Sequence, residues 1–284
     1  MFFLASRIGF ETNYDAKLHG YICPKVSFSG TVHIERKGYS LLHIDKYDED
    51  YLVTMPKMHI EGLMTGNLTP ELSGSTYIRS SSGYTAKIDY TSKGWIGGRK
   101  NGFSARLFHD DNANTPLYTV EGQWSDSWTC KQLDIKKTVD KFNMNSAKRS
   151  PLQVQPINEQ HPLESRRAWR YVSQAIHKGD IFAISYEKSK IENEQREMRA
   201  REQLEGSEFP RRYFSKVNED PVAQKLAKEI KYPFLGADKD MKRGAWIWDE
   251  EKYQKLEAGK DIKSPTRARF DSGVEGIFMD PLES

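Results

Sequence analysis

Apolar and polar residues alternate with a period of two from Met1 to about Asp134, in short runs that turn-forming residues separate. The clearest runs are Val26, Phe28, Val32 and Ile34; Tyr84, Ala86, Ile88 and Tyr90; Phe103, Ala105 and Leu107; and Tyr118, Val120 and Trp124. Alternation places every second side chain on one face of a β-strand, so the pattern predicts roughly nine to eleven short strands in an antiparallel sandwich or barrel. No helical pattern interrupts these runs, which argues against a parallel βαβ sheet.

Aromatic residues are dense in this first part of the chain, and many fall on the apolar side of the alternation. Such residues could line a cavity for an apolar ligand. They could equally fill an ordinary core, which is the more common role of buried aromatic side chains.

The pattern changes after residue 135. Residues 136–158 are polar and predict a loop or linker. Beyond Gln160 the apolar residues take helical spacing, at Leu163, Trp169, Val172 and Ile176. Gly179 fits a helix C-cap.

Two more helices are predicted further along. Residues 187–204 contain good helix formers and neither Gly nor Pro, and Gly206 follows as a stop. Residues 180–186, just before them, are interpreted as a short strand or an extended lead-in. Pro221–Ile230 predicts a helix with proline in its first turn. Trp246 and Trp248 are interpreted as anchors that dock the C-terminal segment on the body of the protein.

The predicted helix over 187–204 carries Lys188, Glu192 and Arg196, each four residues from the next and therefore on one face. Glu192 would pair with both cations and hold them in a row. A row of Lys and Arg can receive a phosphate, because Arg offers a planar fork of donors and Lys a compact charge. On spacing alone, a solvated helix with weak surface ion pairs is the commoner explanation.

Composition excludes several other functions. The net charge is +3 with 29% charged residues, so no global basic field points to nucleic acid. Cys23 and Cys130 match no metal or redox spacing, which suggests a reducing, cytosolic compartment but leaves a single buried disulfide open. The opening MFFLASR is too short for a signal peptide, and no run approaches the about 18 apolar residues of a spanning helix. Any membrane contact is therefore expected to be peripheral.

Enzyme signatures are missing from the sequence. There is no G-x-S-x-G, no phosphate-binding loop and no dinucleotide fingerprint. His59 and Glu61 have the H-x-E spacing of a zinc deaminase, but no P-C-x-x-C follows, and in a strand the two residues simply share a face. The sequence therefore predicts neither an enzyme nor a metal or cofactor site.

Five longer runs resemble the lipid-binding domain of oxysterol-binding protein homologues, in the same order as in that family. They are DEDYLVTMPKMHIEGLMTG (48–66), STYIRSSSGYTAKIDYTSKGWIGGRKNGFSARL (75–107), PLYTVEGQW (116–124), EQHPLESRRAWRYVSQAIHKGD (159–180) and KSKIENEQREMR (188–199). The resemblance covers most of residues 15–255.

The resemblance implies an α+β fold that is mainly β: an incomplete antiparallel β-barrel enclosing a lipid tunnel, with a helical C-terminal part packed on it. It makes residues 1–284 a single lipid-binding domain. The expected parts are a β-barrel part (1–135), the linker (136–158), a helical part (159–258) and a polar tail (259–284).

The resemblance also implies a function. Family members carry one lipid, often a sterol or phosphatidylserine, and many exchange it for phosphatidylinositol 4-phosphate. In the family motif K-x-x-x-E-x-x-x-R the Lys and Arg hold the phosphoinositide headgroup, which assigns that role to Lys188 and Arg196, with Glu192 positioning them. The chain is expected to be cytoplasmic and peripheral at membranes, such as endoplasmic reticulum contact sites, the Golgi or the plasma membrane.

The chain departs from the family pattern in places. The hallmark EQVSHHPP is missing, because Met1 comes just after the point where it should end. An N-terminally truncated domain is therefore expected, with an open strand edge near residues 2–22 that favours self-association. Sterol carriers have Asn and Gln where this chain has Ile22 and Arg36, which argues against sterol as the cargo.

Two other functions stay open: a phosphoinositide or sterol sensor that moves little lipid, and a regulatory fragment that transfers none. A hydrolase is a distant third.

Overall fold

The computed structural model describes residues 6–12, 16–91, 100–148, 156–160, 165–207, 214–217, 220–231 and 245–257. The chain divides into two compact units. The sheet unit comprises residues 1–148 and 213–250, and the helical unit comprises residues 149–212 and 251–284. Each unit is described by itself below.

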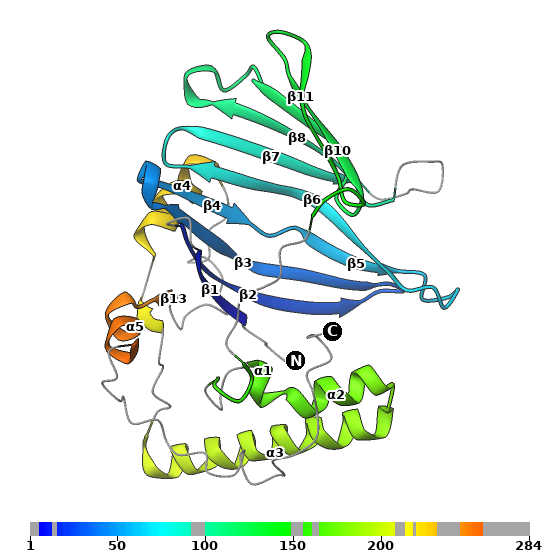
Figure 1. Cartoon of the computed structure of the whole chain (residues 1–284), viewed down its shortest axis with the longest axis vertical. Coiled ribbons are helices and arrows are strands. Elements are labelled where there is room, and N and C mark those ends of the chain that lie inside the picture. Colours follow the sequence, from blue (N-terminus) through cyan, green and yellow to red (C-terminus); the bar gives the residue numbers. More distant parts are fainter. Residues whose placement is uncertain are drawn as a thin grey trace. The chain divides into compact units, whose positions relative to one another are not determined.

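The sheet unit is built on one 11-stranded sheet (Figure 1). Its strands are β1 (Ser6–Thr12), β2 (Ala16–Phe28), β3 (Val32–Ile44), β4 (Glu49–Thr54), β5 (Lys57–Glu61), β6 (Thr69–Ser80), β7 (Tyr84–Thr91), β8 (Gly102–His109), β9 (Tyr118–Gln123), β10 (Ser127–Gln132) and β11 (Lys137–Asn143). The short 3-10 helices η1 (Asp45–Tyr47) and η2 (Asp110–Asn112) lie in two of the turns. The path runs β1-β2-β3-β4-β6-β7-β8-β9-β10-β11, with β5 pairing with β3 and β6.

This sheet confirms the predicted antiparallel β-structure, since β1 to β10 all lie before Asp134 and pair antiparallel. A single sheet favours the barrel over the two-sheet sandwich. Among the described strands, β1 pairs only with β2 and β11 only with β10, so the sheet is not closed. It therefore agrees with the incomplete barrel that the resemblance implies.

The predicted loop over 136–158 is wrong at its start, because β11 occupies Lys137–Asn143. Every residue of this edge strand is exposed, so no face has to be apolar and the alternation that marks a strand is weak. Backbone pairing with β10 holds it in place, together with the stacked rings of Trp128 and Phe142, whose centroids lie 5.7 Å apart.

The helix α4 (Pro221–Glu229) begins with proline, as the sequence predicts, and it packs on one face of the sheet (Figure 1). Asp220 caps it by accepting a hydrogen bond from the Ala223 amide at 3.1 Å. The core of this unit contains Tyr21, Tyr39, Leu41, Leu52, Ala223, Leu226 and Ala227. The Tyr39 hydroxyl donates to Asp220 at 2.7 Å and so ties the cap to the sheet.

Asp220 remains ionised in this core. Burial alone would raise the pKa of Asp220, but hydrogen bonds from His19, Tyr39 and the Ala223 amide outweigh burial and lower it. For Tyr39, burial and the neighbouring Asp220 carboxylate both raise the pKa, so its hydroxyl stays a donor.

Gly38 lies where the backbone of β3 comes close to that of β2. Its φ is +140°, and an added Cβ atom would lie 2.0 Å from the Tyr21 carbonyl oxygen. We expect Gly38→Ala to lower the free energy of unfolding by at least about 2 kcal/mol, measured by chemical denaturation. Gly30 is the control: its φ is +80°, but a Cβ there meets nothing within 4 Å, so Gly30→Ala should cost only the backbone strain of about 1 kcal/mol. Equal losses would contradict the close approach.

A small second sheet pairs β12 (Phe214–Val217) with β13 (Ala245–Trp248). The rings of Phe214 and Trp248 meet edge to face, with centroids 5.8 Å apart. Because β13 also contacts β2, Trp248 lies in a segment that docks on the main sheet, as predicted. The side chain of Trp246 lies outside the described residues. The helix α5 (Glu250–Glu257) follows.

The helical unit contains α1 (Ser165–Ala168), α2 (Arg170–Lys178) and α3 (Ile181–Glu205), and α2 and α3 pack against each other (Figure 1). Gly179 and Gly206 adopt the left-handed conformation at the ends of α2 and α3, which confirms both predicted stops. Val172 is buried, as its helical spacing predicts, whereas Leu163 lies outside the described residues.

Both predictions for residues 180–186 are wrong, because α3 already begins at Ile181. The segment is rich in β-branched and aromatic residues, which favour strands. Asp180, however, accepts a hydrogen bond from the Ala183 amide at 2.9 Å and starts the helix there. The helix then continues without a break to the charged stretch that was predicted helical.

Candidate functional site

Lys188, Glu192 and Arg196 lie on one side of α3, one turn apart, and all belong to the helical unit. The Lys188 ammonium pairs with the Glu192 carboxylate at 3.7 Å. The Arg196 guanidinium instead donates to the Asn193 side-chain oxygen. Among the described residues, the prediction that Glu192 pairs with both cations is therefore right for Lys188 and wrong for Arg196.

This arrangement leaves Arg196 available to an anion. Its partner Asn193 is neutral, so the guanidinium keeps its full charge while its direction is fixed. The Lys188 side chain is 55% exposed, and its pair with Glu192 is a surface ion pair of small energy. An incoming phosphate could therefore engage both cations without breaking a strong internal contact.

Across β7 to β9 the main sheet has one apolar face and one polar face, because antiparallel register aligns the alternating residues of neighbouring strands. On the apolar face, Ile88 lies opposite Ala105, and Ala105 lies opposite Val120. The apolar face also includes Ile78, Ala86, Tyr90, Phe103, Leu107 and Tyr118. On the other face, Asp89 receives ion pairs from Lys87 at 3.3 Å and Arg106 at 3.4 Å.

Residues of the apolar face on β7 to β9 are mostly half-buried, so they still offer apolar surface. The helix α4 does not cover this surface, because α4 packs on the opposite face of the sheet, where Leu52 and Arg79 lie. The apolar face can therefore cover a hydrophobic ligand body. The sequence left open whether these aromatic residues line a cavity or fill a core.

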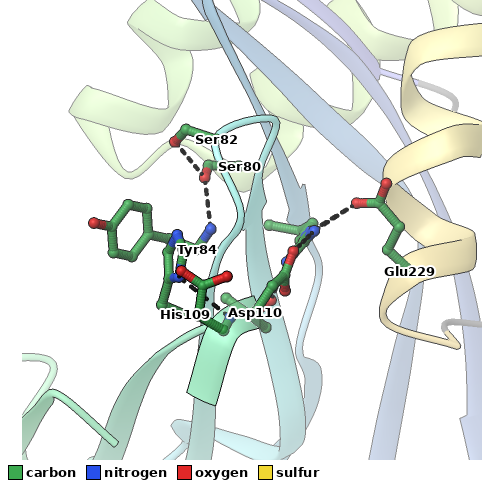
Figure 2. Close-up of polar contacts among 9 residues, drawn as sticks. Ser80, Ser82, Tyr84, His109, Asp110 and Glu229 are labelled. Atoms are coloured by element: carbon green, nitrogen blue, oxygen red, sulfur yellow. Dashed lines mark hydrogen bonds and ion pairs between the residues drawn. The ribbon is translucent and has the colours of Figure 1, made fainter. Parts of the chain in front are cut away.

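A cluster at the end of β6 and β8 holds Ser, His and Asp side chains but lacks the geometry of a catalytic triad (Figure 2). The Ser80 hydroxyl pairs with the Ser82 hydroxyl at 2.9 Å and accepts from the Tyr84 amide at 3.1 Å. His109 pairs with Asp111 at 3.2 Å, and within the described part of the chain no serine hydroxyl bonds to His109. This cluster is a turn network.

The same region contains a buried arginine that the sequence did not single out. Arg79 is 5% exposed and binds the Asp110 carboxylate through two hydrogen bonds, of 2.6 and 2.7 Å. It also donates to Glu229, the last residue of α4, at 2.8 Å. Figure 2 shows Asp110 and Glu229 approaching from η2 and α4. Hydrogen bonding to Arg79 lowers the pKa of Asp110, so the network is charged at neutral pH. Its role is to hold α4 on the sheet.

The other sequence candidates behave as ordinary structure. His59 and Glu61 do share a face, with 3.1 Å between the imidazole nitrogen and the carboxylate. Cys23 and Cys130 do not form a disulfide, so the bridge that the sequence left open is not present between them. Within the described ranges, no group of three His, Cys, Asp or Glu side chains could hold a metal ion. None of the described helices is long and apolar enough to span a bilayer.

Sequence reasoning missed that four apolar side chains are exposed near the turn between α2 and α3. Ile176, Ile181, Phe182 and Tyr186 are 58%, 77%, 90% and 67% exposed. Ile181, Phe182 and Tyr186 were overlooked because residues 180–186 were interpreted as a strand or lead-in, whereas α3 begins at Ile181. Ile176 was identified from its helical spacing, but its side chain is exposed near the end of α2. We call these four residues the hairpin tip.

Comparison with known proteins gives one consistent family. The family model described as "Oxysterol-binding protein" matches residues 8–251. The "Probable transporter efuK" of Hormonema carpetanum is 33% identical over 246 residues, covering 85% of this chain and 35% of that protein. "Oxysterol-binding protein homolog C354.07c" of Schizosaccharomyces pombe is 35% identical over 234 residues, covering 82% of this chain and 57% of that protein. The chain thus spans between about a third and three fifths of these relatives.

Solved structures share the fold. The Osh1 ORD domain in complex with ergosterol matches with a TM-score of 0.64 at 15% identity, covering 90% of this chain and 63% of that chain. The Osh3 ORD in complex with PI(4)P from Saccharomyces cerevisiae matches with a TM-score of 0.55 at 19% identity, covering 76% of this chain and 62% of that chain.

Proposed function

The chain belongs to the oxysterol-binding protein family, and from this we propose that it extracts a lipid from one membrane and delivers it to another. Proteins of this family bind lipids and are not enzymes, which agrees with the lack of catalytic motifs in the sequence. The observation that carries the proposal is the apolar face of the main sheet, whose half-buried side chains offer cover to a hydrophobic ligand.

Burial of apolar lipid surface would drive extraction. Each 100 Å² removed from water contributes about 2.5 kcal/mol, so a lipid that places several hundred Å² on the apolar face can leave a bilayer without a large net cost. The sheet needs no chemical step to do this. The cargo of the forward step is a sterol or phosphatidylserine, and an Osh1 ORD domain has been solved with ergosterol.

Phosphatidylinositol 4-phosphate is the proposed counter-ligand. Lys188 and Arg196 supply two cations one above the other, which suits a phosphorylated headgroup, and Glu192 orients Lys188. An Osh3 ORD has been solved with this phosphoinositide. We propose that binding of the two lipids is mutually exclusive, so that the gradient of one drives transport of the other.

Transfer between two liposome populations tests this function. Donor liposomes carry a fluorescent phosphatidylserine or sterol, and acceptors contain or lack phosphatidylinositol 4-phosphate. A transporter moves the cargo catalytically and faster when the phosphoinositide is in the acceptor. A sensor binds the phosphoinositide without moving cargo, and a non-transferring fragment does neither, so either of those results would contradict the proposal.

The hairpin tip would bring the protein to the membrane. Ile181 and Phe182 are 77% and 90% exposed at the turn between α2 and α3, and Lys178 lies close to them in sequence at the end of α2. Apolar side chains next to a cation suit the interface of an anionic membrane. We place this contact on the cytoplasmic leaflet, at endoplasmic reticulum contact sites, the Golgi or the plasma membrane.

Replacing Ile181 and Phe182 together by Ser should weaken vesicle binding at least about tenfold, because two large apolar side chains no longer enter the interface. Sedimentation with phosphatidylserine-containing liposomes measures this. Leu204→Ser is the control, because Leu204 is 87% exposed on the same helix but lies at its far end. If both variants lose binding equally, the hairpin tip is not the contact.

A further inference from the structure

Arg36 lies in the apolar part of the sheet and makes one hydrogen bond within the described residues. It follows Ile34 by two residues in β3, where the register with β2 is continuous, so both side chains point to the same side. The Nε atom donates to the Pro56 carbonyl oxygen at 3.0 Å. Pro56 lies between β4 and β5, where β3 changes from one strand partner to the other. This bond uses the Nε–H group of the guanidinium. The terminal N–H groups make no hydrogen bond with the described residues, so they can donate to a ligand.

Arg36 differs from other arginines of the sheet in its charge balance. Among the residues that the structure describes, no carboxylate lies within ion-pair distance of it. Burial lowers the pKa of Arg36 and the nearby Tyr90 phenol partly restores it, yet a guanidinium stays protonated at neutral pH. Two other arginines of the sheet, Arg79 and Arg106, each form an ion pair with an aspartate carboxylate. A partly desolvated cation without a counter-charge is costly unless a ligand supplies one.

Two hydroxyl groups accompany Arg36 on the apolar face. Thr76 is 2% exposed and donates to the Tyr90 hydroxyl oxygen at 3.5 Å, so the phenol keeps its own hydrogen to donate. Thr76 lies opposite Ile88, and Tyr90 lies opposite Phe103, so apolar residues flank these hydroxyls. We call Arg36, Thr76 and Tyr90 the polar island.

We propose that the polar island receives the anionic group, a carboxylate or a phosphate, of a lipid whose hydrocarbon lies along the apolar face. This rests on the lipid-binding function proposed above and specifies its cargo: an anionic lipid in preference to a neutral sterol. A carboxylate or phosphate can accept two parallel N–H bonds from Arg36 and one O–H bond from Tyr90. A sterol hydroxyl accepts fewer bonds and brings no charge, so it would leave the guanidinium unneutralised.

The test measures the affinity of the full chain and of Arg36→Gln for three ligands by fluorescence displacement: oleate (carboxylate), phosphatidic acid (phosphate) and cholesterol (neutral). We expect Arg36→Gln to lose at least about tenfold in affinity for oleate, phosphatidic acid or both, and to keep or gain affinity for cholesterol. The ligand whose affinity falls shows whether the polar island receives a carboxylate or a phosphate. An equal effect on all three ligands, or none on the anions, overturns the proposal.

Two controls separate this proposal from its premise and from misfolding. Lys25→Gln removes a cation from an exposed position on neighbouring β2, opposite Glu35, and should leave all affinities unchanged. Arg36→Lys keeps the charge but not the fork, so it should retain part of the anion affinity even if Arg36→Gln folds poorly. If the native chain binds none of the three ligands, the lipid-binding function itself fails. If it binds them but Arg36→Gln and Arg36→Lys leave the anion preference intact, only the polar island is wrong.

Discussion

Replacing Asp110 by Asn and Glu229 by Gln together should lower the free energy of unfolding by about 3–5 kcal/mol, the cost of leaving a buried charge unpaired. Arg79 is 5% exposed and bonds to both carboxylates, which come from η2 and from the end of α4. With both carboxylates replaced by amides, the partners of the guanidinium among the described residues are amide oxygens and the Thr85 hydroxyl. Thermal and chemical denaturation would measure the loss.

Replacing the arginine instead of the two carboxylates should lower the free energy of unfolding by a smaller amount. In Arg79→Met the two carboxylates are released, and since their side chains are 56% and 34% exposed, water can solvate them. The buried position then holds an apolar side chain of similar length. Asp111→Asn is a neutral control next in sequence, because the Asp111 side chain is 90% exposed. A larger loss for Arg79→Met than for the double variant would show that the arginine is not the desolvated partner.

Replacing Lys188 and Arg196 together by Ala should weaken binding of phosphatidylinositol 4-phosphate by at least about 2 kcal/mol, or about thirtyfold in Kd. Both charge-assisted contacts to a multiply charged headgroup would be lost. Extraction of the other cargo should survive if that lipid depends mainly on the apolar face. Isothermal titration with a short-chain phosphoinositide would measure the Kd.

The matched control is Lys190→Ala with Arg201→Ala, which removes the same charge from the same helix. Because successive helical residues turn by about 100°, these two positions lie on a different side of α3 from Lys188 and Arg196. An equal loss in the control would mean that α3 attracts the headgroup only through its net charge. Glu192→Ala should weaken binding less than Arg196→Ala, because Glu192 orients Lys188 but repels phosphate.

The sequence predicts well what local rules control. Alternation gave the strands up to β10, and the glycines after α2 and α3 and the proline of α4 gave the helix ends, because each acts on its immediate neighbours. The same rules missed β11, whose exposed residues need no alternation, and the start of α3, where the Asp180 cap prevails over strand-forming side chains.

Contacts between distant segments were beyond sequence reasoning. Arg79 and Glu229 are 150 residues apart, and Tyr39 and Asp220 are 181 apart, so no spacing rule connects them. The row formed by Lys188, Glu192 and Arg196 is an intermediate case. The four-residue spacing predicted that the three side chains share one face of the helix. It did not predict that Arg196 bonds to Asn193 and not to Glu192, because this depends on side-chain conformations.

Native mass spectrometry of the chain, after incubation with mixed liposomes and removal of the vesicles, tests the central claim most directly. The account predicts a species carrying a single lipid, which Ala105→Lys on the apolar face abolishes and Ser104→Lys on the opposite face preserves. A chain that stays lipid-free, or that keeps its lipid equally in both variants, would contradict the claim that the apolar face of the sheet carries the cargo.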